Sequence, residues 1–325
     1  MKKVSIIAGG AGFVGANLLS VLSREDRHLV ILDNLSRGRE QYLENAQRVA
    51  PGTVHFFNVD LSDLAQTLRG FKFANDLGQV DEVWHLAANS DIPAGVLDAS
   101  VDLRDTFMTT FALLEAMKSF NICIIHFASS SAIYGDLGDV PLHESIGPLM
   151  PISNYGAMKL ASEALISAAA ESYLERANLF RFPNVVGIPA THGVILDFIN
   201  KLLVNPEKLH VLGDGSQQKA YLHASDLIVA MMIIRAQKIA GKVSIVNIGP
   251  VDHGVTVRCI AEQVVARVSP RAAIEFGQGN KGWVGDVPRF NYSTDRLQSY
   301  GWEPALGSAA AITRAIDEIA LQLGR

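Results

Sequence analysis

Runs of apolar residues alternate with helical patterns through the first half of the chain. Strand-like runs lie near residues 3–8, 28–33, 53–57, 82–86, 122–128 and 178–182. Helical patterns lie between and after them, near residues 13–24, 62–76, 98–119 and 153–176. Strands that are buried on both faces read as continuous apolar runs, as a parallel sheet with helices on both sides requires. The pattern predicts an α/β fold with a doubly wound parallel sheet, of the Rossmann type, with about six or seven strands.

The second half of the chain has a looser pattern, because proline and glycine separate shorter elements after residue 182. A helical stretch near 224–239 and a strand near 243–248 indicate a return to the sheet. The remaining elements would form a smaller C-terminal lobe over the carboxyl ends of the strands, where ligands bind in open α/β folds. The expected division is residues 1–182 plus about 221–249 for the sheet domain, and residues 183–220 plus about 250–325 for the lobe.

A glycine-rich turn lies between the first strand and the first helix, and an acid ends the second strand. Glycine lets the backbone approach a pyrophosphate, which binds at the N-terminus of the following helix, where free N–H groups favour anions. Asp33 ends the second strand, where its carboxylate can accept hydrogen bonds from an adenosine ribose. Strand, glycines, helix and acid at this interval predict a dinucleotide-binding site. The glycines fit two registers, G-x-G-x-x-G from Gly10 and G-x-x-G-x-x-G from Gly9, which share Gly12 and Gly15.

The acid at the end of the second strand also bears on the choice of cofactor. A carboxylate beside the ribose repels a 2′-phosphate, so Asp33 favours NAD over NADP. Arg37 and Arg39 follow closely in the sequence, and they leave NADP open. Asp60 follows the third predicted strand, and we expect it near the adenine side of the same crevice.

Composition narrows the class of protein. The chain has 325 residues, of which 49% are hydrophobic and 19% charged, as is typical of a soluble globular protein. The net charge of −5 provides no basic surface for nucleic acid. The first strand begins at about residue 3, which leaves no room for a signal peptide. No apolar run has the roughly eighteen residues of a membrane span, and we expect a cytoplasmic protein.

Neither the cysteines nor the histidines indicate a disulfide framework or a metal centre. The chain has two cysteines, and Cys123 lies in an apolar run that is typical of a core strand. The histidines show no metal-ligand spacing with one another or with a cysteine, so we predict no metal.

A tyrosine and a lysine four residues apart begin the helical run near 153–176. Tyr155 and Lys159 would lie on the same face of that helix. A phenol is a poor base at its free pKa of about 10, but a nearby ammonium and the positive nicotinamide ring stabilise the phenolate and lower that pKa. Tyr155 would then exchange protons with a substrate hydroxyl near neutral pH.

Three serines, Ser129, Ser130 and Ser131, follow the fifth predicted strand at the mouth of the crevice. A serine hydroxyl at this place can hydrogen-bond the same substrate oxygen that Tyr155 deprotonates. Serines in loops also bond to backbone groups, which is the structural alternative for this trio.

A series of motifs spans nearly the whole chain in one order. They are Ala8-Gly-Gly-Ala-Gly-Phe-Val-Gly15, Asp33-Asn-Leu-Ser-Arg-Gly38, His85-Leu-Ala-Ala88, Ser129-Ser-Ser-Ala-Ile-Tyr-Gly135, Tyr155-x-x-x-Lys159, Arg181-Phe-Pro-Asn184, Leu212-Gly-Asp-Gly215, Tyr221-Leu-His223 and Val246-Asn-Ile-Gly249. Together they resemble the NAD-dependent nucleotide-sugar epimerase/dehydratase family, which belongs to the extended short-chain dehydrogenase/reductases. Within that family the chain most resembles the UDP-glucose 4-epimerases.

The resemblance implies a role for each matching residue. Ser130, Tyr155 and Lys159 match the catalytic serine, tyrosine and lysine. The implied cofactor is NAD, and the residues implied to bind it are Gly9, Gly12, Phe13, Val14, Gly15, Asp33, Asn34, Ser36, Arg37, Gly38, Asp60, Leu61, Leu86, Ala87, Ala88, Tyr155 and Lys159. The residues implied to bind a nucleotide sugar are Ser130, Ser131, Asn184, Lys219 and Tyr221. The family also suggests a homodimer, in which the helical runs near 98–119 and 153–176 pair across a two-fold axis.

The chain departs from its relatives at several positions. Relatives that act as 4,6-dehydratases carry Asp-Glu where this chain has Ser131-Ala132, so a dehydratase reaction is disfavoured. Lys219 replaces a common arginine and keeps its charge, but loses the bidentate geometry of a guanidinium. Trp283 replaces a second phosphate-binding arginine, for which Lys281 or Arg289 could substitute, and Thr106 replaces a common asparagine.

We therefore expect an epimerase that acts at C4 of a nucleotide sugar through a transient 4-keto intermediate. The same residues could serve a nucleotide-sugar dehydrogenase, reductase, decarboxylase or dehydratase. A third class is a non-catalytic sensor that binds a dinucleotide, although a sensor has no need of the complete Ser130, Tyr155 and Lys159 set. The sequence leaves the sugar and the nucleotide open.

Overall fold

A seven-stranded parallel sheet forms the centre of the molecule. The computed structural model describes residues 2–138, 140–279 and 291–325. The strands are β1 (Lys3–Ala8), β2 (Arg27–Asp33), β3 (Val54–Asn58), β4 (Gln79–His85), β5 (Ile124–Ala128), β7 (Arg176–Arg181) and β12 (Val243–Asn247). Their order is β12-β7-β5-β4-β1-β2-β3, and every neighbouring pair is parallel. The strand order reverses between β1 and β4, which confirms the predicted doubly wound fold and places a ligand crevice at this switch point.

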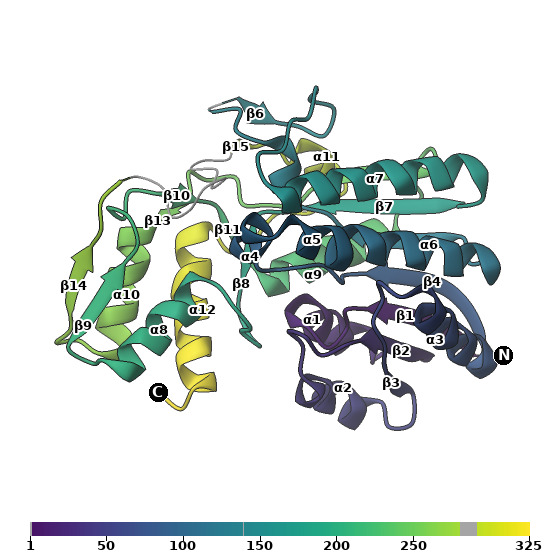
Figure 1. The fold of residues 1–325 in the computed structure, drawn as a ribbon, viewed down its shortest axis with the longest axis horizontal. Helices are drawn as coiled ribbons and strands as arrows, with labels where there is room; N and C mark the ends of the chain where they lie inside the picture. The colour runs from purple at the N-terminus through teal and green to yellow at the C-terminus, as the bar shows by residue number, and fades with distance from the viewer. Residues whose placement is uncertain (1, 139, 280–290) are drawn as a thin grey trace.

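Helices cover both faces of the sheet (Figure 1). One face packs against α3 (Leu64–Leu77), α6 (Thr109–Ser119) and α7 (Asn154–Ser172). The other packs against α1 (Phe13–Leu22) and α9 (Ala224–Ala236). Alternate residues of the strands enter the two cores, so that Ile6 lies in one and Ile7 in the other. The short segments η1 (Glu40–Leu43) and α2 (Glu44–Val49) follow β2.

The predicted helix near 98–119 is interrupted. The chain forms α4 (Ile92–Leu97), which the pattern did not predict, then α5 (Ala99–Asp102), a π-helical segment η2 (Leu103–Met108), and α6. The hydroxyls of Thr109 and Thr110 both donate to the carbonyl oxygen of Thr106, at 2.9 and 3.2 Å. Threonine hydroxyls that bond to the preceding turn compete with the backbone and bend helices, which explains why the regular pattern changes in this segment.

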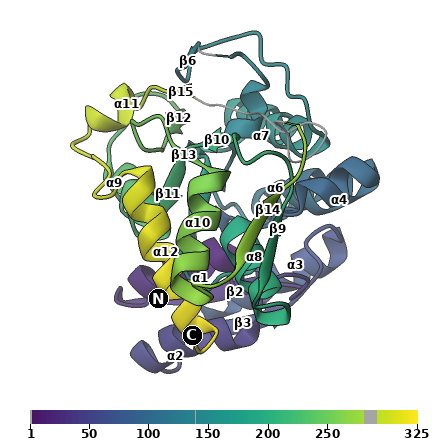
Figure 2. The same ribbon diagram turned by 90° about the vertical axis from the view of Figure 1, so that its left-hand side faces the viewer.

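The C-terminal lobe lies to the left of the sheet domain in Figure 1 and faces the viewer in Figure 2. Its helices are α8 (Val194–Val204), α10 (Val257–Val268) and α12 (Ser308–Gln322), and they share an apolar core with β9 (Lys208–Val211) and β14 (Ala273–Phe276). The remaining short elements are η3 (Ser131–Tyr134), β6 (Pro141–Leu142), β8 (Asn184–Val186), β10 (Gln218–Lys219), β11 (Tyr221–His223), β13 (Val255–Thr256), β15 (Asn291–Tyr292) and α11 (Asp295–Gln298). Leu297 and Trp302 pack into the sheet-domain core on the side of α9.

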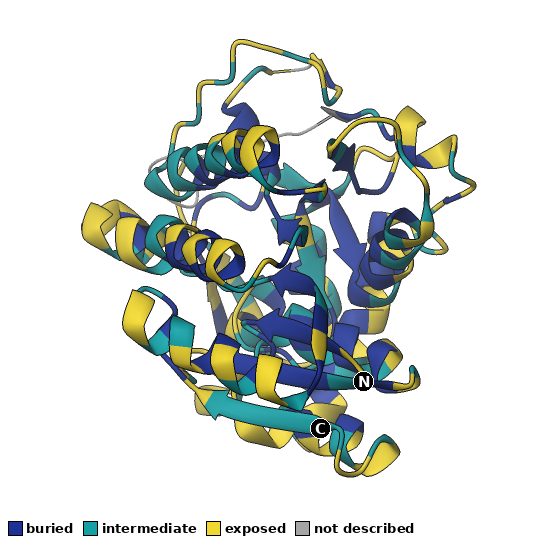
Figure 3. Cartoon of the chain, turned by 90° about the vertical axis from the view of Figure 1, so that its right-hand side faces the viewer, coloured by how far each residue is buried: buried dark blue, intermediate teal, exposed yellow. Residues whose placement is uncertain are grey.

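Burial follows this layered arrangement (Figure 3). The strands β1 and β2 are almost entirely buried, whereas the helices expose one side. Among the described residues, no helix combines the length and the apolar character needed to cross a membrane.

A cluster of buried charges connects strands β1, β2, β4 and β5 with helix α9. Glu82 accepts hydrogen bonds from Ser5 Oγ, Arg27 Nη1 and Arg235 Nε at 2.6, 2.7 and 2.8 Å. His126 Nε2 lies 3.3 Å from the same carboxylate. Burial alone would raise the pKa of Glu82, but His126 and Arg235 lower it well below its ordinary value. The carboxylate therefore stays ionised where it joins two arginines from different elements.

Replacement of Glu82 by glutamine should destabilise the fold by about 3 kcal/mol, because Arg27 and Arg235 lose their most buried carboxylate partner and keep only Glu25 and Asp81, which are more exposed. The folded-state pKa lies below the unfolded value of about 4.3, so the contribution of Glu82 is present at neutral pH and is lost as pH falls below about 4. Urea unfolding of Glu82→Gln at pH 7 measures the loss. Asp76→Asn, in an exposed ion pair with Lys72, is the control and should change stability by under about 0.5 kcal/mol; an equally small effect of Glu82→Gln would contradict the prediction.

Candidate active site

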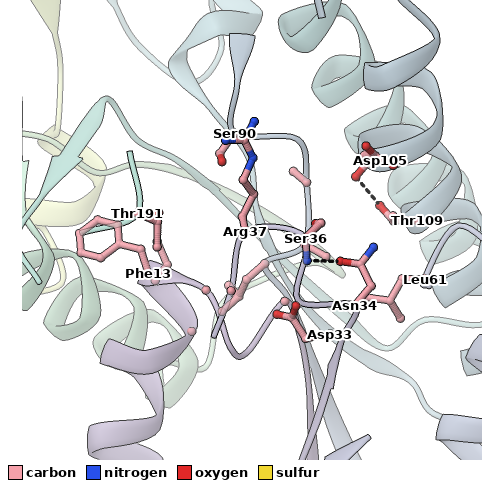
Figure 4. Close-up of a pocket in the computed structure, with 18 of the residues that line it drawn as sticks. Phe13, Asp33, Asn34, Ser36, Arg37, Leu61, Ser90, Asp105, Thr109 and Thr191 are labelled. Atoms are coloured by element: carbon pink, nitrogen blue, oxygen red, sulfur yellow. Dashed lines mark hydrogen bonds between the residues drawn. The ribbon is translucent and has the colours of Figure 1, made fainter. Parts of the chain in front are cut away.

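A pocket opens at the switch point of the sheet, beyond the carboxyl ends of β1 to β4 (Figure 4). Apart from Tyr155 and Lys159, every residue predicted to bind the cofactor lines it: Gly9, Gly12, Phe13, Val14, Gly15, Asp33, Asn34, Ser36, Arg37, Gly38, Asp60, Leu61, Leu86, Ala87 and Ala88. These residues come from four separate loops, and the parallel sheet brings them together because its strands end at the same edge. The sequence prediction missed six lining residues, which are Val59, Ser90, Asp105, Thr109, Thr191 and His192.

The glycine turn adopts the register that begins at Gly9. Gly9, Gly12 and Gly15 line the pocket, whereas Gly10 packs against the side chains of Ile7 and Ile31. Gly9 has a φ of +79°, and a Cβ at this position would lie 2.6 Å from the backbone nitrogen of Ala87. Both the left-handed backbone and the close approach of the β4 loop therefore require glycine. The structure thus distinguishes the two registers that the sequence left open.

The turn leaves the start of α1 open to the pocket. Gly12 is the N-cap residue of this helix and offers no side-chain cap, and the first turn contains no acid. The first N–H groups of a helix have no partner inside the helix, and with the helix dipole they favour an anion. This environment fits the pyrophosphate of a dinucleotide.

Asp33 borders the pocket at the end of β2. Its two carboxylate oxygens accept hydrogen bonds from the backbone N–H groups of Ala11 and Leu35, at 3.0 and 2.8 Å. Burial raises the pKa of Asp33, and these two hydrogen bonds oppose the rise. Each oxygen retains a lone pair, so the carboxylate can still accept bonds from a ribose. Asn34 lies beside it and accepts the backbone N–H of Ser36 at 3.0 Å (Figure 4).

Arg37, which in the sequence left NADP as a possible cofactor, forms an ion pair with a carboxylate in the structure. Its Nη2 lies 2.7 Å from Oδ2 of Asp91, which also caps α4 by accepting the N–H of Ala94. The hydrogen bond to Arg37 is the largest influence that lowers the pKa of Asp91. The guanidinium is thus already paired with a carboxylate, which reduces its attraction for a 2′-phosphate.

The three predicted catalytic residues meet beyond the carboxyl end of β5. Ser130 caps η3 by accepting the N–H of Ala132 at 3.1 Å, and its side chain is close enough to Tyr155 to oppose the rise of the phenol pKa. Ser153 is the N-cap of α7, and its Oγ accepts the N–H of Gly156 at 3.1 Å. Because the cap fixes where α7 begins, Tyr155 lies in the first turn of the helix and Lys159 in the second.

Burial dominates the electrostatics of this site. The side chain of Lys159 is buried; its Nζ donates to the carbonyl oxygen of Ala128 at 2.6 Å and lies 5.8 Å from the centre of the Tyr155 ring. Burial lowers the pKa of Lys159 to about 7. Burial also raises the pKa of Tyr155 to about 12, and the side chain of Ser130 opposes the rise. In the protein alone, the tyrosine pKa is therefore raised, whereas we expected it to be lowered, because desolvation of the phenolate outweighs its polar contacts.

The residues predicted to bind substrate lie outside the dinucleotide pocket. Ser131 is buried, and its backbone N–H donates to the carbonyl oxygen of Phe182. Asn184 and Tyr221 are register partners on the parallel strands β8 and β11, and Lys219 lies on β10. The exposed fraction of Tyr221 is 4%, since its ring packs in the core of the lobe. Three further candidates, Lys281, Trp283 and Arg289, lie outside the described residues.

Two buried carboxylates next to the catalytic residues were missed by sequence reasoning. Glu163 lies one turn beyond Lys159 on α7 and forms an ion pair with Arg181, with Nη2 and Oε2 2.6 Å apart. Asp102 ends α5, is fully buried, and affects the pKa of both Tyr155 and Lys159. The spacing of Lys159 and Glu163 could have suggested that they share a helix face. Nothing in the local sequence places Asp102 near α7.

Comparison with known proteins identifies relatives along nearly the whole chain. The profile of the NAD dependent epimerase/dehydratase family matches residues 5–249. A UDP-glucose 4-epimerase of Streptomyces lividans is 28% identical over 324 residues, which cover 95% of this chain and 94% of that protein. The crystal structure of a UDP-galactose 4-epimerase has a TM-score of 0.85 and 31% identity, covering 98% of this chain and 99% of the other. A UDP-glucose 4-epimerase of Thermus thermophilus, solved in complex with NAD, has a TM-score of 0.83 and 26% identity, covering 97% and 98%.

These comparisons confirm the predicted resemblance and the prediction of NAD as the cofactor. The pocket fits this group in three ways: an open helix N-terminus for the pyrophosphate, a carboxylate for the ribose, and glycines where the backbone loops approach one another. The small side chains of Ala87 and Ala88 border the same pocket after β4.

Asp33→Asn should reduce the preference for NAD over NADP by about tenfold or more, equivalent to about 1.4 kcal/mol. The substitution removes the negative charge that repels a 2′-phosphate but keeps an oxygen for a backbone N–H. Calorimetric titration of cofactor-free protein with each dinucleotide measures the two dissociation constants. Asp63→Asn is a matched control at an exposed helix cap and should leave the preference unchanged. If the ratio in Asp33→Asn equals that of the native protein, Asp33 does not select the cofactor.

Proposed function

The chain belongs to the NAD dependent epimerase/dehydratase family, and we propose that it epimerises a nucleotide-activated sugar at C4. The observation that carries this proposal is the meeting of Ser130, Tyr155 and Lys159 beyond the carboxyl end of β5, the strand next to β4 in the sheet. In the proposed reaction, this group transfers the proton while the bound cofactor exchanges the hydride. Relatives named as UDP-glucose and UDP-galactose 4-epimerases match over almost their full length, which supports the same class of reaction.

The roles of the chain's own residues follow from their contacts. Tyr155 takes the proton from the C4 hydroxyl of the sugar and returns it when the hydroxyl is formed again. Ser130, which opposes the rise of the Tyr155 pKa, binds the same sugar oxygen and orients it toward the phenol. The pocket residues would hold NAD, which would supply reversible hydride acceptance and a positive ring that favours the phenolate. Tyr155 carries one proton in each direction, so a cycle leaves no net change in the protein.

The alternative reactions differ in what they need beyond this set. Elimination of water across C5 and C6 needs an acid and a base, but Ser131 and Ala132 stand at the corresponding positions, and Ser131 is buried in contact with Phe182. Dehydrogenation, reduction and decarboxylation need net redox or loss of carbon dioxide. These reactions consume a stoichiometric amount of cofactor or change the mass of the sugar, whereas epimerisation does neither.

The lobe supplies the proposed contacts to the nucleotide diphosphate. Asn184 is exposed at the start of β8, next to β11, and Ala220 alone separates Lys219 from β11. A diphosphate held away from water needs cationic or N–H partners, and these two side chains provide one cation and one amide. The relatives act on UDP-sugars according to their names, so we propose a UDP-hexose as the substrate.

We also propose a homodimer formed through α6 and α7. These helices are neighbours on one face of the sheet (Figure 1). Helix α7 exposes small residues, including Ala164, Ser167 and Ala168, and α6 exposes the ring of Phe111 in part. Small side chains let two helices approach closely, and an aromatic ring adds apolar area to a self-complementary patch.

The first test is incubation of the protein with a panel of UDP-, GDP-, CDP- and dTDP-sugars, followed by chromatography and mass spectrometry. A product with unchanged mass, formed repeatedly without added cofactor, supports epimerisation. Tyr155→Phe should lower turnover by about 10² to 10⁴ while the content of NAD stays unchanged, because the variant loses one hydroxyl. Tyr173→Phe removes a hydroxyl that donates to Leu114 at the far end of α7 and should retain activity. A fully active Tyr155→Phe would exclude Tyr155 as the proton-transfer group.

The proposed dimer predicts a mass of twice the chain mass of 35.1 kDa by light scattering at micromolar concentration. Ala168→Glu, which places a charge on the exposed face of α7, should shift the protein toward the monomer because an unpaired charge is costly inside an interface. Ala309→Glu, at an exposed position of α12 in the lobe, serves as the control. A native protein that elutes as a monomer would contradict this assembly.

A further inference from the structure

A second pocket lies at the amino ends of β7 and β12, at the opposite end of the strands from the cofactor pocket. Its volume is about 220 Å³, whereas one water molecule needs roughly 10–15 Å³ of such space, so a small molecule fits. Helix α9 ends at Ala236, and the loop 237–242 leads from it to β12. The polar residues that line the pocket are Glu175, Arg176, Asn178, Lys238, Lys242 and Ser244.

The two strands direct three polar side chains toward this pocket. Arg176 and Asn178 are two residues apart on β7, and Ser244 on β12 is the register partner of Asn178. Side chains two apart on a strand, and those of register partners on neighbouring strands, lie on the same face of a sheet. Phe180 and Val246 continue the same two rows and pack in the core that includes α9. The three polar side chains therefore lie on the α9 face, where the helix has already ended.

The hydroxyl of Ser244 is buried without a hydrogen bond. The exposed fraction of this residue is 5%, and its Oγ has no partner among the described residues. A buried hydroxyl that makes no hydrogen bond costs free energy. Since Ser244 lines the pocket, its O–H can donate to an acceptor that is held there.

Arg176 is fixed by neutral groups and keeps donors for a ligand. Its Nε donates to Oδ1 of Asn178 at 3.3 Å, and its Nη2 donates to the carbonyl oxygen of Ile234. Asn178 is itself held, because its Nδ2 donates to Nδ1 of His126 at 2.9 Å. Within the described part of the chain, Nη1 of Arg176 makes no hydrogen bond and the guanidinium forms no ion pair. A partly buried guanidinium without a counter-ion favours the binding of an anion.

Two lysines and one acid complete the charge of the pocket. Lys238 and Lys242 occupy exposed positions in the loop after α9, and Lys242 donates to the carbonyl oxygen of Ala170 at 2.7 Å. Neither lysine forms an ion pair with a described residue. Together with Arg176 they supply three cations against the exposed carboxylate of Glu175, a net charge of +2 in a chain whose net charge is −5. This concentration of positive charge beside a buried hydroxyl indicates a site for a small anion that carries more than one negative charge.

We propose that this pocket binds a phosphate group, as inorganic phosphate or as the phosphate of a small phosphorylated metabolite, through Arg176, Lys238 and the hydroxyl of Ser244. A phosphate monoester carries a charge of about −1.5 to −2 and three acceptor oxygens, which match the net charge and the donors of the pocket. The site is separate from the proposed epimerisation. Arg176 and Arg181 begin and end β7, and a strand of this length spans roughly 17 Å, so the ligand would not compete with the cofactor.

The test is calorimetric titration of NAD-saturated protein with inorganic phosphate at constant ionic strength. Bound NAD prevents phosphate from entering the cofactor pocket, and saturable binding of one phosphate per chain is expected at millimolar concentration. Ser244→Ala and Lys238→Gln should each weaken this binding by about tenfold, as expected for loss of one hydrogen bond to a charged group. Glu175→Gln should strengthen it by about twofold to fivefold, because the substitution removes an exposed charge of the same sign as the ligand.

Matched controls separate this pocket from the rest of the molecule. Ser23→Ala removes another buried hydroxyl without a hydrogen-bond partner, at the end of α1, and Lys72→Gln removes an exposed charge from α3. Both variants should bind phosphate as the native protein does, and so should Lys219→Gln, which changes the proposed diphosphate contact of the lobe. Absence of saturable binding, or binding that is lost in Lys219→Gln but kept in Ser244→Ala and Lys238→Gln, would overturn the inference.

Titration with a hexose phosphate distinguishes the two sources of the phosphate group. Binding that is tighter than that of inorganic phosphate, and weakened by the same substitutions, assigns the pocket to a phosphorylated metabolite; equal or weaker binding assigns it to inorganic phosphate. Ser244→Ala removes a hydroxyl that has no partner, so the variant should unfold in urea as the native protein does. None of these measurements needs turnover of a nucleotide sugar, so failure of the proposed function would leave the test of this site intact.

Discussion

The buried ion pair between Glu163 and Arg181 fixes the geometry on which the site depends. It joins α7, which carries Tyr155 and Lys159, to the carboxyl end of β7. Ser129 donates to the same Glu163 carboxylate, so the loop that presents Ser130 is tied to this pair. Arg181 also donates to the hydroxyl of Tyr134, which in turn donates to Asn247 at the end of β12. Three neighbouring strands and helix α7, with its proposed catalytic residues, are thus held by one chain of charged hydrogen bonds.

The low-dielectric surroundings that strengthen the ion pair between Glu163 and Arg181 also determine the pKa values of the groups next to it. A charge in a low-dielectric interior is stable only when it is paired, and an unpaired group changes its pKa instead. Glu163 has an arginine and remains a structural anion. Lys159 has backbone and ring contacts and a lowered pKa, so its protonation responds to a nearby carboxylate. Pairing therefore separates the charges that hold the fold from the charges that can take part in proton transfer.

The sequence predicted those features that depend on residues close to one another in the chain. Apolar runs located the seven sheet strands to within a few residues, and the glycine turn with Asp33 located the cofactor pocket, because each signal lies within one strand–turn–helix unit. The π-helical segment, the burial of Asp102 and the pocket contacts of His192 were not predicted. Each depends on how distant segments pack, and a residue such as Asp102 reads locally as an ordinary polar position on a helix.

The cofactor pocket and the proposed substrate-binding part of the site differ in the same way. The cofactor is held by loops that all leave one edge of one sheet, so the fold alone brings Gly9, Asp33 and Ala87 together. Asn184 and Lys219 are placed by the small strands β8, β10 and β11, which depend on packing between the lobe and the sheet domain. Under the proposed function, changes in those strands can alter the sugar nucleotide that is bound without disturbing the sheet. Ser130, Tyr155 and Lys159 follow or flank strands of the sheet, so the fold constrains the proposed chemistry more tightly than the choice of substrate.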